Sequence, residues 1–172
     1  MTATTAIPNH SQPASVPSRP PPRRICLICS KGTLDMAYPG LVLANAARMN
    51  GIGAMIFFTF WGLDLITKKK VDRLRVATVG NPSLPIPTWL GAIPGVAAFV
   101  TRQMKRGMAK LDIPTIPEFL EMLEAGSCEM YACKMAMDML KLTPADLVPQ
   151  VTGVLTAMEF MDKSEGAQII FI

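Results

Sequence analysis

Ala54-Met55-Ile56-Phe57-Phe58-Thr59-Phe60 is the stretch that decides the fold, because it is continuous, apolar and aromatic. A short run of this kind between glycines predicts a strand buried on both faces. Ile25–Cys29 is a second such run, and the segment Asp35–Asn50 between them carries apolar residues at helical spacing and ends in Asn50-Gly51. The order strand, helix, strand predicts a right-handed βαβ unit with parallel strands.

The rest of the chain continues this alternation. Further strands are predicted at Val71–Val79, 128–133 and Ala167–Ile172. Further helices are predicted at Gly95–Leu111, Pro117–Ala125, 134–140 and Val151–Lys163. Asn81–Pro94 is rich in proline and resists regular structure. This order predicts an α/β fold with an open, doubly wound, mainly parallel sheet of four to five strands and helices on both faces.

Length and composition fit one folded domain with a tail. At 172 residues, half of them hydrophobic and 17% charged, the chain is long enough for one sizeable core. Residues 1–24 are rich in Pro, Ser and Thr, so we expect a disordered tail followed by a single domain over residues 25–172. Within that domain, residues 81–112 are expected to form an insertion or lid made of a Pro-rich loop and an amphipathic helix.

The charge of the chain argues against a nucleic-acid partner. The formal net charge is +4, and residues 1–24 hold Arg19, Arg23 and Arg24 with no acidic residue, so 4 minus 3 leaves about +1 on the domain. A nearly neutral domain without a basic stripe does not fit a nucleic acid. The small charged fraction and the thirteen methionines instead favour self-association and adaptable binding faces.

No segment has the pattern of a signal peptide or a membrane span. Ile25–Cys29 is too short for a signal sequence, and no uninterrupted apolar run approaches 18 residues. We therefore expect a cytoplasmic protein. The helix predicted at residues 95–111 has one apolar face and carries Arg102, Lys105 and other basic residues elsewhere. Such a helix packs on the sheet or on another subunit, or makes a peripheral contact with an anionic membrane.

Cys133 is the candidate reactive residue. It ends the short strand predicted at residues 128–133 and precedes a helix, where free backbone N–H groups and the positive end of the helix dipole favour thiolate over thiol. Lys134 adds positive charge beside it. A free cysteine is also a common small buried hydrophobe, and position alone leaves both interpretations open.

The other three cysteines are Cys26, Cys29 and Cys128. The four thiols are spaced superficially like a zinc site, but Cys26 and Cys29 lie inside a strand and not on a knuckle turn, so we expect no metal. Alternation along residues 128–133 turns Cys128 and Cys133 to opposite faces, which predicts a structural role for Cys128. Cys29 is the candidate second thiol, on the condition that its strand neighbours the strand of Cys133.

Ligands of doubly wound sheets bind at the carboxyl ends of the strands. The turn Ser30-Lys31-Gly32-Thr33 and Cys133 both lie at the carboxyl ends of predicted strands. Ser30, Lys31 and Gly32 form no Walker or dinucleotide motif, but they can present backbone N–H groups to an anion at the start of the next helix. Asn81 in the Pro-rich loop is a further substrate-binding candidate. The lone His10 lies in the tail, so no histidine-based site is expected.

Several motifs together are similar to one known family. They are Ser30-Lys31-Gly32-Thr33-Leu34-Asp35-Met36-Ala37, Leu43-Ala44-Asn45-Ala46-Ala47, Phe57-Phe58-Thr59-Phe60-Trp61-Gly62, Gly80-Asn81-Pro82, Pro94-Gly95 and Tyr131-Ala132-Cys133-Lys134-Met135-Ala136-Met137-Asp138. Over residues 25–172 the chain resembles the DsrE/DsrF/DsrH-like sulfur-carrier family, in the branch often labelled peroxiredoxin-like. It has no Thr-x-x-Cys motif, so the peroxiredoxin label gains no support.

The resemblance implies a flavodoxin-like subunit that assembles into a homo-oligomer. Active members of this family carry sulfane sulfur as a cysteine persulfide or thiosulfonate between donor and acceptor proteins. The family thiol maps to Cys133, and some members of the branch use a second cysteine.

These observations lead to two hypotheses of different classes. The first is a cytoplasmic sulfurtransferase or sulfur carrier in which Cys133 takes sulfur from thiosulfate, a polysulfide or a partner's persulfide and passes it to an acceptor thiol. Lys134 and the Ser30–Thr33 turn would stabilise the anionic adduct, and no metal or organic cofactor is expected. The alternative is a non-catalytic oligomeric binding module, or a membrane-surface module, that uses residues 95–111. A third hypothesis, flavin or nucleotide binding by analogy with flavodoxin, has only the predicted fold to support it.

Overall fold

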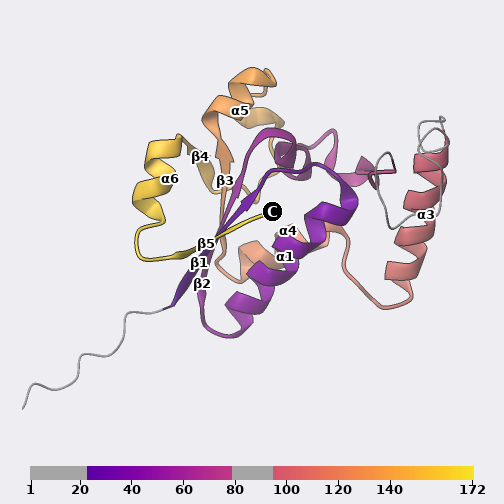
Figure 1. Ribbon diagram of the computed structural model, residues 1–172, viewed down its shortest axis with the longest axis horizontal. Helices are drawn as coiled ribbons and strands as arrows, with labels where there is room; N and C mark the ends of the chain where they lie inside the picture. The colour runs from indigo at the N-terminus through magenta and orange to yellow at the C-terminus, as the bar shows by residue number, and fades with distance from the viewer. Residues whose placement is uncertain (1–22, 79–94) are drawn as a thin grey trace, which may run out of the picture.

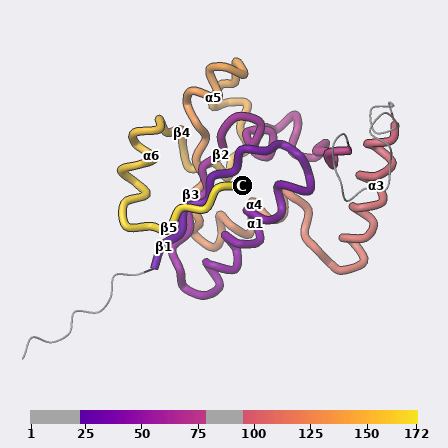
Figure 2. Tube along the Cα trace, viewed as in Figure 1, coloured from indigo at the N-terminus to yellow at the C-terminus, as the bar shows by residue number. Residues whose placement is uncertain are grey.

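The computed structural model describes residues 23–78 and 95–172. Its centre is one sheet of five parallel strands in the order β4-β3-β2-β1-β5 (Figure 1). The strands are β1 (Arg24–Cys29), β2 (Gly53–Phe58), β3 (Glu129–Cys133), β4 (Gly153–Leu155) and β5 (Gln168–Phe171). After β4 the chain crosses back to pair β5 with β1 at the opposite edge, as the tube in Figure 2 traces.

Helical segments connect these strands. The α-helices are α1 (Leu34–Met49), α3 (Val96–Ala109), α4 (Ile116–Ala125), α5 (Lys134–Met139) and α6 (Ala157–Lys163). Short 3-10 segments are η1 (Phe60–Ile66), η2 (Val71–Arg73) and η3 (Pro144–Asp146). The helices predicted before Asn50-Gly51, at residues 95–111, at 117–125 and at 134–140 are confirmed to within a few residues.

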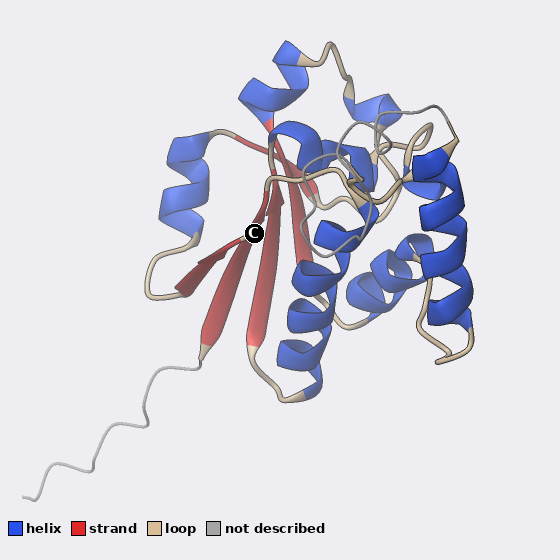
Figure 3. Ribbon diagram, turned by 45° about the vertical axis from the view of Figure 1, so that its right-hand side comes forward, coloured by secondary structure: helices blue, strands red, loops and turns tan. Residues whose placement is uncertain are grey.

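Helices cover both faces of the sheet (Figures 1 and 3). α1 and α4 pack together on one face, and α6 lies on the other, where the ring of Phe57 stacks on Phe160 with 4.6 Å between centroids. Side chains such as Leu27, Ile56 and Leu120 fill the core and are almost fully buried. Burying each such side chain contributes about 1.5–3 kcal/mol. The predicted open, doubly wound parallel sheet is therefore confirmed, with five strands.

The prediction of a strand at Val71–Val79 is wrong for residues 71–78, which the structure describes. Val71–Arg73 is a 3-10 turn, and residues 74–78 form no ladder. The backbone of this segment braces two helices instead, because Leu34 N donates to Arg75 O at 2.9 Å and Val76 N donates to Thr101 Oγ1 at 3.0 Å. Burial of alternate side chains produced a strand-like pattern without a neighbouring strand.

The helix predicted at Val151–Lys163 is also wrong in its first half. That half forms β4, and α6 begins only after Thr156, whose side chain and that of Glu159 form a capping box. The strand predicted at Ala167–Ile172 exists as β5, but it is an edge strand and not a buried one. Ile169 and Phe171 on it are 44% and 69% exposed.

α3 lies on the opposite side of the molecule from α6 (Figure 1). It carries a single buried side chain, Thr101, and exposes Phe99. No helix within residues 23–78 and 95–172 combines the length and the apolar content that crossing a membrane requires.

Candidate functional site

The candidate site is the edge of the sheet where the parallel strands end. Cys29 of β1, Phe58 of β2 and Ala132 of β3 share one level of the sheet. Continuing this register by one residue brings Ser30, Thr59 and Cys133 to the next level, in keeping with the hydrogen bond from Thr59 N to Cys29 O at 3.0 Å. This edge is where open α/β sheets bind their ligands.

Cys133 is the last residue of β3 and the N-cap of α5. Its side chain is only 5% exposed and accepts no capping hydrogen bond. It pairs in register with Leu155 of β4. Strand alternation turns it to the α6 face, the same face as Tyr131. The thiol therefore lies just below the surface of the edge.

Lys134 follows Cys133, but its ammonium group is directed elsewhere. Nζ lies 2.6 Å from Oδ1 and 2.5 Å from Oδ2 of Asp138, one helical turn along α5. Both side chains of this pair are more than half exposed. In the structure Lys134 therefore forms an ion pair with the carboxylate of Asp138 and does not interact with the thiol of Cys133.

The other three thiols are poor nucleophiles. Burial raises the pKa of Cys29 to about 12, and burial likewise raises the pKa of Cys128 to about 12 despite the opposing charge of Arg48. Burial also raises the pKa of Cys26. Only the thiolate form of a cysteine attacks sulfur, so these three are disfavoured at neutral pH.

The condition set for a Cys29–Cys133 pair is not met. β2 lies between β1 and β3, which separates the two residues by two strand spacings, about 10 Å. Cys29 also points to the α1 face, where a Cβ on Gly40 would meet its Sγ at 2.6 Å. Cys128, which comes just before β3, interacts with Arg48 of α1, so it too belongs to the α1 side.

The Ser30–Thr33 turn lies at the same edge, on the side away from β3. Ser30 is tied to the end of β5, because its N–H and its Oγ both donate to Ile172 O, at 2.9 and 3.0 Å. Lys31 is exposed. Thr33 Oγ1 is buried and has no hydrogen-bond partner among the described residues. A hollow of about 430 Å³ beside the turn is lined by Gly32 and Thr33 together with basic side chains such as Lys69.

Close backbone packing explains the glycine of this turn. A Cβ on Gly32 would overlap the carbonyl oxygen of Trp61, and a Cβ on Gly62 would overlap the carbonyl oxygen of Cys29. The turn after β1 and the segment after β2 therefore lock together. This packing explains why residue 32 is a glycine, and no bound ligand is needed to explain it.

The residues after β2 carry no motif that singles them out from sequence as part of the site. The register of β2 and β3 ends at Phe58 and Ala132, and continuing it by one residue places Thr59, the extended N-cap of η1, opposite Cys133 on the same face of the sheet. Phe60 adopts a left-handed φ of 46° and is 42% exposed, and Trp61 is 56% exposed. With Met135 and Met139 of α5, 63% and 52% exposed, these residues form an apolar rim on η1 and α5. Their signal in the sequence was an aromatic pair placed after a strand.

Asn81 lies outside the described residues. Within the part of the chain that is described, no three His, Cys, Asp or Glu side chains are grouped so that they could hold a metal ion.

The description of a known protein family, the DsrE/DsrF/DrsH-like family, matches residues 22–172. The chain belongs to this family. It is 34% identical over 153 residues to the sulfur carrier protein DsrE2 of Allochromatium vinosum, a match that covers 83% of this chain and 95% of that protein. The resemblance inferred from the sequence is therefore confirmed.

Two further relatives have names that state no activity. The uncharacterized protein YrkE of Bacillus subtilis is 24% identical over 156 residues, covering 87% of this chain and 97% of that protein. The crystal structure of the YchN protein from E. coli superimposes with a TM-score of 0.54 at 14% identity, over 87% of this chain and 99% of that one. At this identity the likeness to YchN supports the fold alone.

Proposed function

We propose that the protein traffics sulfane sulfur, with Cys133 as the residue that carries it. The observation that supports this most is the position of Cys133 at the carboxyl edge of β3 in a chain 34% identical to a sulfur carrier. The raised pKa values of Cys26, Cys29 and Cys128 argue against each of them as the carrier.

The proposed chemistry is two displacements at sulfur. The Cys133 thiolate attacks the outer sulfur of a donor persulfide, the S–S bond of the donor breaks, and the donor thiolate leaves with the bonding pair. An acceptor thiolate then attacks the terminal sulfur of the Cys133 persulfide and releases the Cys133 thiolate. With thiosulfate as donor the leaving group is sulfite, and with tetrathionate displacement of thiosulfate leaves a thiosulfonate on Cys133. Each step conserves electrons, so no redox cofactor is needed.

The surroundings of Cys133 support a protein partner. The thiol is 5% exposed, so a donor or acceptor must approach over the apolar rim of Phe60, Trp61, Met135 and Met139. Exposed methionine and aromatic side chains are typical of adaptable protein contacts. Sulfur donor and acceptor proteins are therefore the proposed partners, in a reducing compartment such as the cytoplasm where all four cysteines stay free.

Intact mass spectrometry tests the assignment. Reduced protein is incubated with polysulfide, thiosulfate or tetrathionate, and the modified peptide is mapped. We expect a DTT-reversible adduct on Cys133, lost in Cys133→Ser and retained in Cys128→Ser. An adduct that persists in Cys133→Ser, or that never forms on folded protein, would contradict the proposal.

A non-catalytic oligomeric or membrane-surface module is the alternative function. Its support is α3, which exposes Phe99 at 70% together with basic side chains, and β5, which exposes Phe171 at 69%. An unreactive Cys133, with vesicle binding lost on charge reversal at Arg102 and Lys105, would favour it. A homo-oligomer is proposed for the sulfur carrier and for the binding module alike. Light scattering of wild type and of Phe171→Ser tests it.

A further inference from the structure

A strongly basic groove runs between α3 and the segment that follows η2. It has a volume of about 510 Å³. Five cationic side chains line it, with no carboxylate among the lining residues: Arg73, Arg75, Arg102, Lys105 and Arg106. The near-neutral charge of the domain had suggested no basic stripe, but the fold collects these cations from two separate segments.

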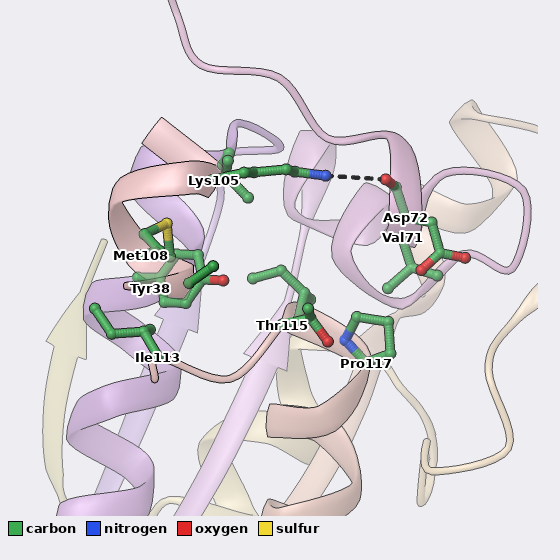
Figure 4. A pocket seen from close by; sticks show the side chains of 11 residues that line it. Tyr38, Val71, Asp72, Lys105, Met108, Ile113, Thr115 and Pro117 are labelled. Atoms are coloured by element: carbon green, nitrogen blue, oxygen red, sulfur yellow. Dashed lines mark hydrogen bonds between the residues drawn. The ribbon is translucent and has the colours of Figure 1, made fainter. Parts of the chain in front are cut away.

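Hydrogen bonds hold the two walls of the groove together. Thr101 on α3 accepts from Val76 N at 3.0 Å and donates to Ala97 O at 2.6 Å, and its side chain is buried in the floor. Lys105 Nζ donates to the backbone carbonyl of Asp72 at 3.2 Å, as Figure 4 shows. A separate cavity of about 170 Å³ lies behind these contacts, between α3 and Tyr38. The groove is thus a preformed feature of the fold.

The guanidinium groups of the groove have no ion-pair partner. All thirteen carboxylates of the chain lie within the described residues, since residues 1–22 and 79–94 contain no Asp or Glu. The ion pairs between described side chains join Arg24 to Glu129, Lys70 to Asp64 and Lys134 to Asp138. None of them involves a cation of the groove. Five exposed like charges on neighbouring surfaces repel one another, and a bound anion would remove that repulsion.

We propose that this groove binds a ligand that carries two or more phosphate groups close together. Arginine presents a planar fork of N–H donors that matches the oxygens of phosphate, and four of the five cations are arginines. A cluster of five positive charges favours a multiply charged ligand over a single phosphate. The volume of the groove falls in the range of small-molecule sites.

The groove is independent of the sulfur chemistry proposed for Cys133. It is built by α3 and residues 73–75, and it shares Arg73 and Arg75 with the hollow beside the Ser30–Thr33 turn. The phosphate groups can belong to a free metabolite or to a lipid headgroup such as that of cardiolipin. Both present the same chemistry to the arginines, and the test separates them.

Calorimetry with tripolyphosphate in a phosphate-free buffer of about 0.15 M ionic strength tests the proposal. Arg102→Glu and Arg106→Glu reverse one charge each in the groove, and Lys163→Glu makes the same change on α6, on the opposite side of the molecule. We expect saturable binding that is tighter than that of orthophosphate and about 10–100-fold weaker in each arginine variant. Lys163→Glu should stay within about twofold of wild type, because Lys163 lies on the far side of the molecule and salt screens distant exposed charges. Circular dichroism confirms folding of each variant.

The second arm uses vesicles of phosphatidylcholine with and without cardiolipin. Binding of cardiolipin vesicles alone, with the same dependence on Arg102 and Arg106, would assign the phosphates to a lipid. Binding of tripolyphosphate alone would assign them to a free ligand. If neither probe binds, or if Lys163→Glu weakens binding as much as the arginine variants do, the groove is not a phosphate site.

Discussion

Gly62 lies so close to Cys29 that a Cβ on the glycine would overlap the carbonyl oxygen of the cysteine. The contact joins the end of β1 to η1, and Gly62 N also donates to Ser30 O at 3.1 Å. It therefore fixes the segment that carries Phe60 and Trp61 over the carboxyl edge. No other residue type fits this position without moving one of the two backbones.

Gly62→Ala is predicted to destabilise the protein by about 2 kcal/mol or more, because the clash involves backbone that cannot rotate away. Urea unfolding measures the change. Gly107→Ala is the matched control, since nothing lies within 4 Å of a Cβ there. Gly107 lies in the last turn of α3, where the same substitution should stabilise by up to about 1 kcal/mol. Equal effects of the two substitutions would show that the Gly62 contact carries no constraint.

Cys133 is predicted to react with iodoacetamide before the other thiols. At pH 8 a thiol of pKa about 12 is ionised in roughly one molecule in 10,000, which protects Cys29 and Cys128. Peptide mapping after timed alkylation of the native protein gives the order. In urea the four rates should converge, because the burial that raises these pKa values is lost. Faster native labelling of Cys128 than of Cys133 would refute the assignment.

Alkaline pH is predicted to destabilise the fold through Cys29. Its pKa is about 12 when folded, against an ordinary value of 9.0. Between pH 9 and 12 the unfolded chain loses this proton while the folded protein keeps it, so stability falls as pH rises. The contribution is about 1.4 kcal/mol by pH 10 for one such thiol.

Free energies of unfolding at pH 8, 9 and 10 measure this loss. Cys29→Ala should be less stable at pH 8, because the side chain is buried against α1, but its stability should fall less steeply with pH. The informative quantity is the difference in slope between the two proteins. Parallel curves would mean that Cys29 ionises normally in the folded state.

The sequence predicted the fold where local pattern and tertiary role agree. β1 and β2 are short apolar runs that are also buried, and α1 has helical periodicity and ends at a helix-stop sequence. The predictions for these three elements are therefore confirmed. Residues 151–155 failed because β4 is only three residues long and its apolar residues run directly into those of α6. The capping pair Thr156 and Glu159 marked the true helix start and was overlooked.

The site was harder to predict because it depends on strand order. Proximity of Cys29 and Cys133 required neighbouring strands, and the insertion of β2 between them is a property of the whole sheet. Lys134 is adjacent to Cys133 in sequence, but helical geometry places Asp138 within reach of its ammonium group. The groove cations come from residues 73–75 and from α3, two segments that only tertiary structure brings together.

Thr59 is predicted to support the reactivity of Cys133. Continuing the register of β2 and β3 by one residue puts the two residues opposite each other on one face, and Thr59 is 8% exposed. A hydroxyl on the neighbouring segment can donate to a thiolate or to the terminal sulfur of a persulfide, which favours the charged form. Thr59→Val removes the donor while keeping the shape of the side chain, and Thr59→Ser keeps the donor. We expect sulfur loading and alkylation of Cys133 to slow about 3–10-fold in Thr59→Val and to recover in Thr59→Ser.

The pH dependence of alkylation separates a chemical role of Thr59 from a structural one. If the hydroxyl stabilises the thiolate, the midpoint of the rate profile moves to higher pH in Thr59→Val and returns in Thr59→Ser. A packing defect would instead lower the rate at every pH without moving the midpoint, and it would also lower stability in urea. An unchanged midpoint with full loading in Thr59→Val would remove Thr59 from the site and leave Cys133 to depend on its backbone surroundings alone.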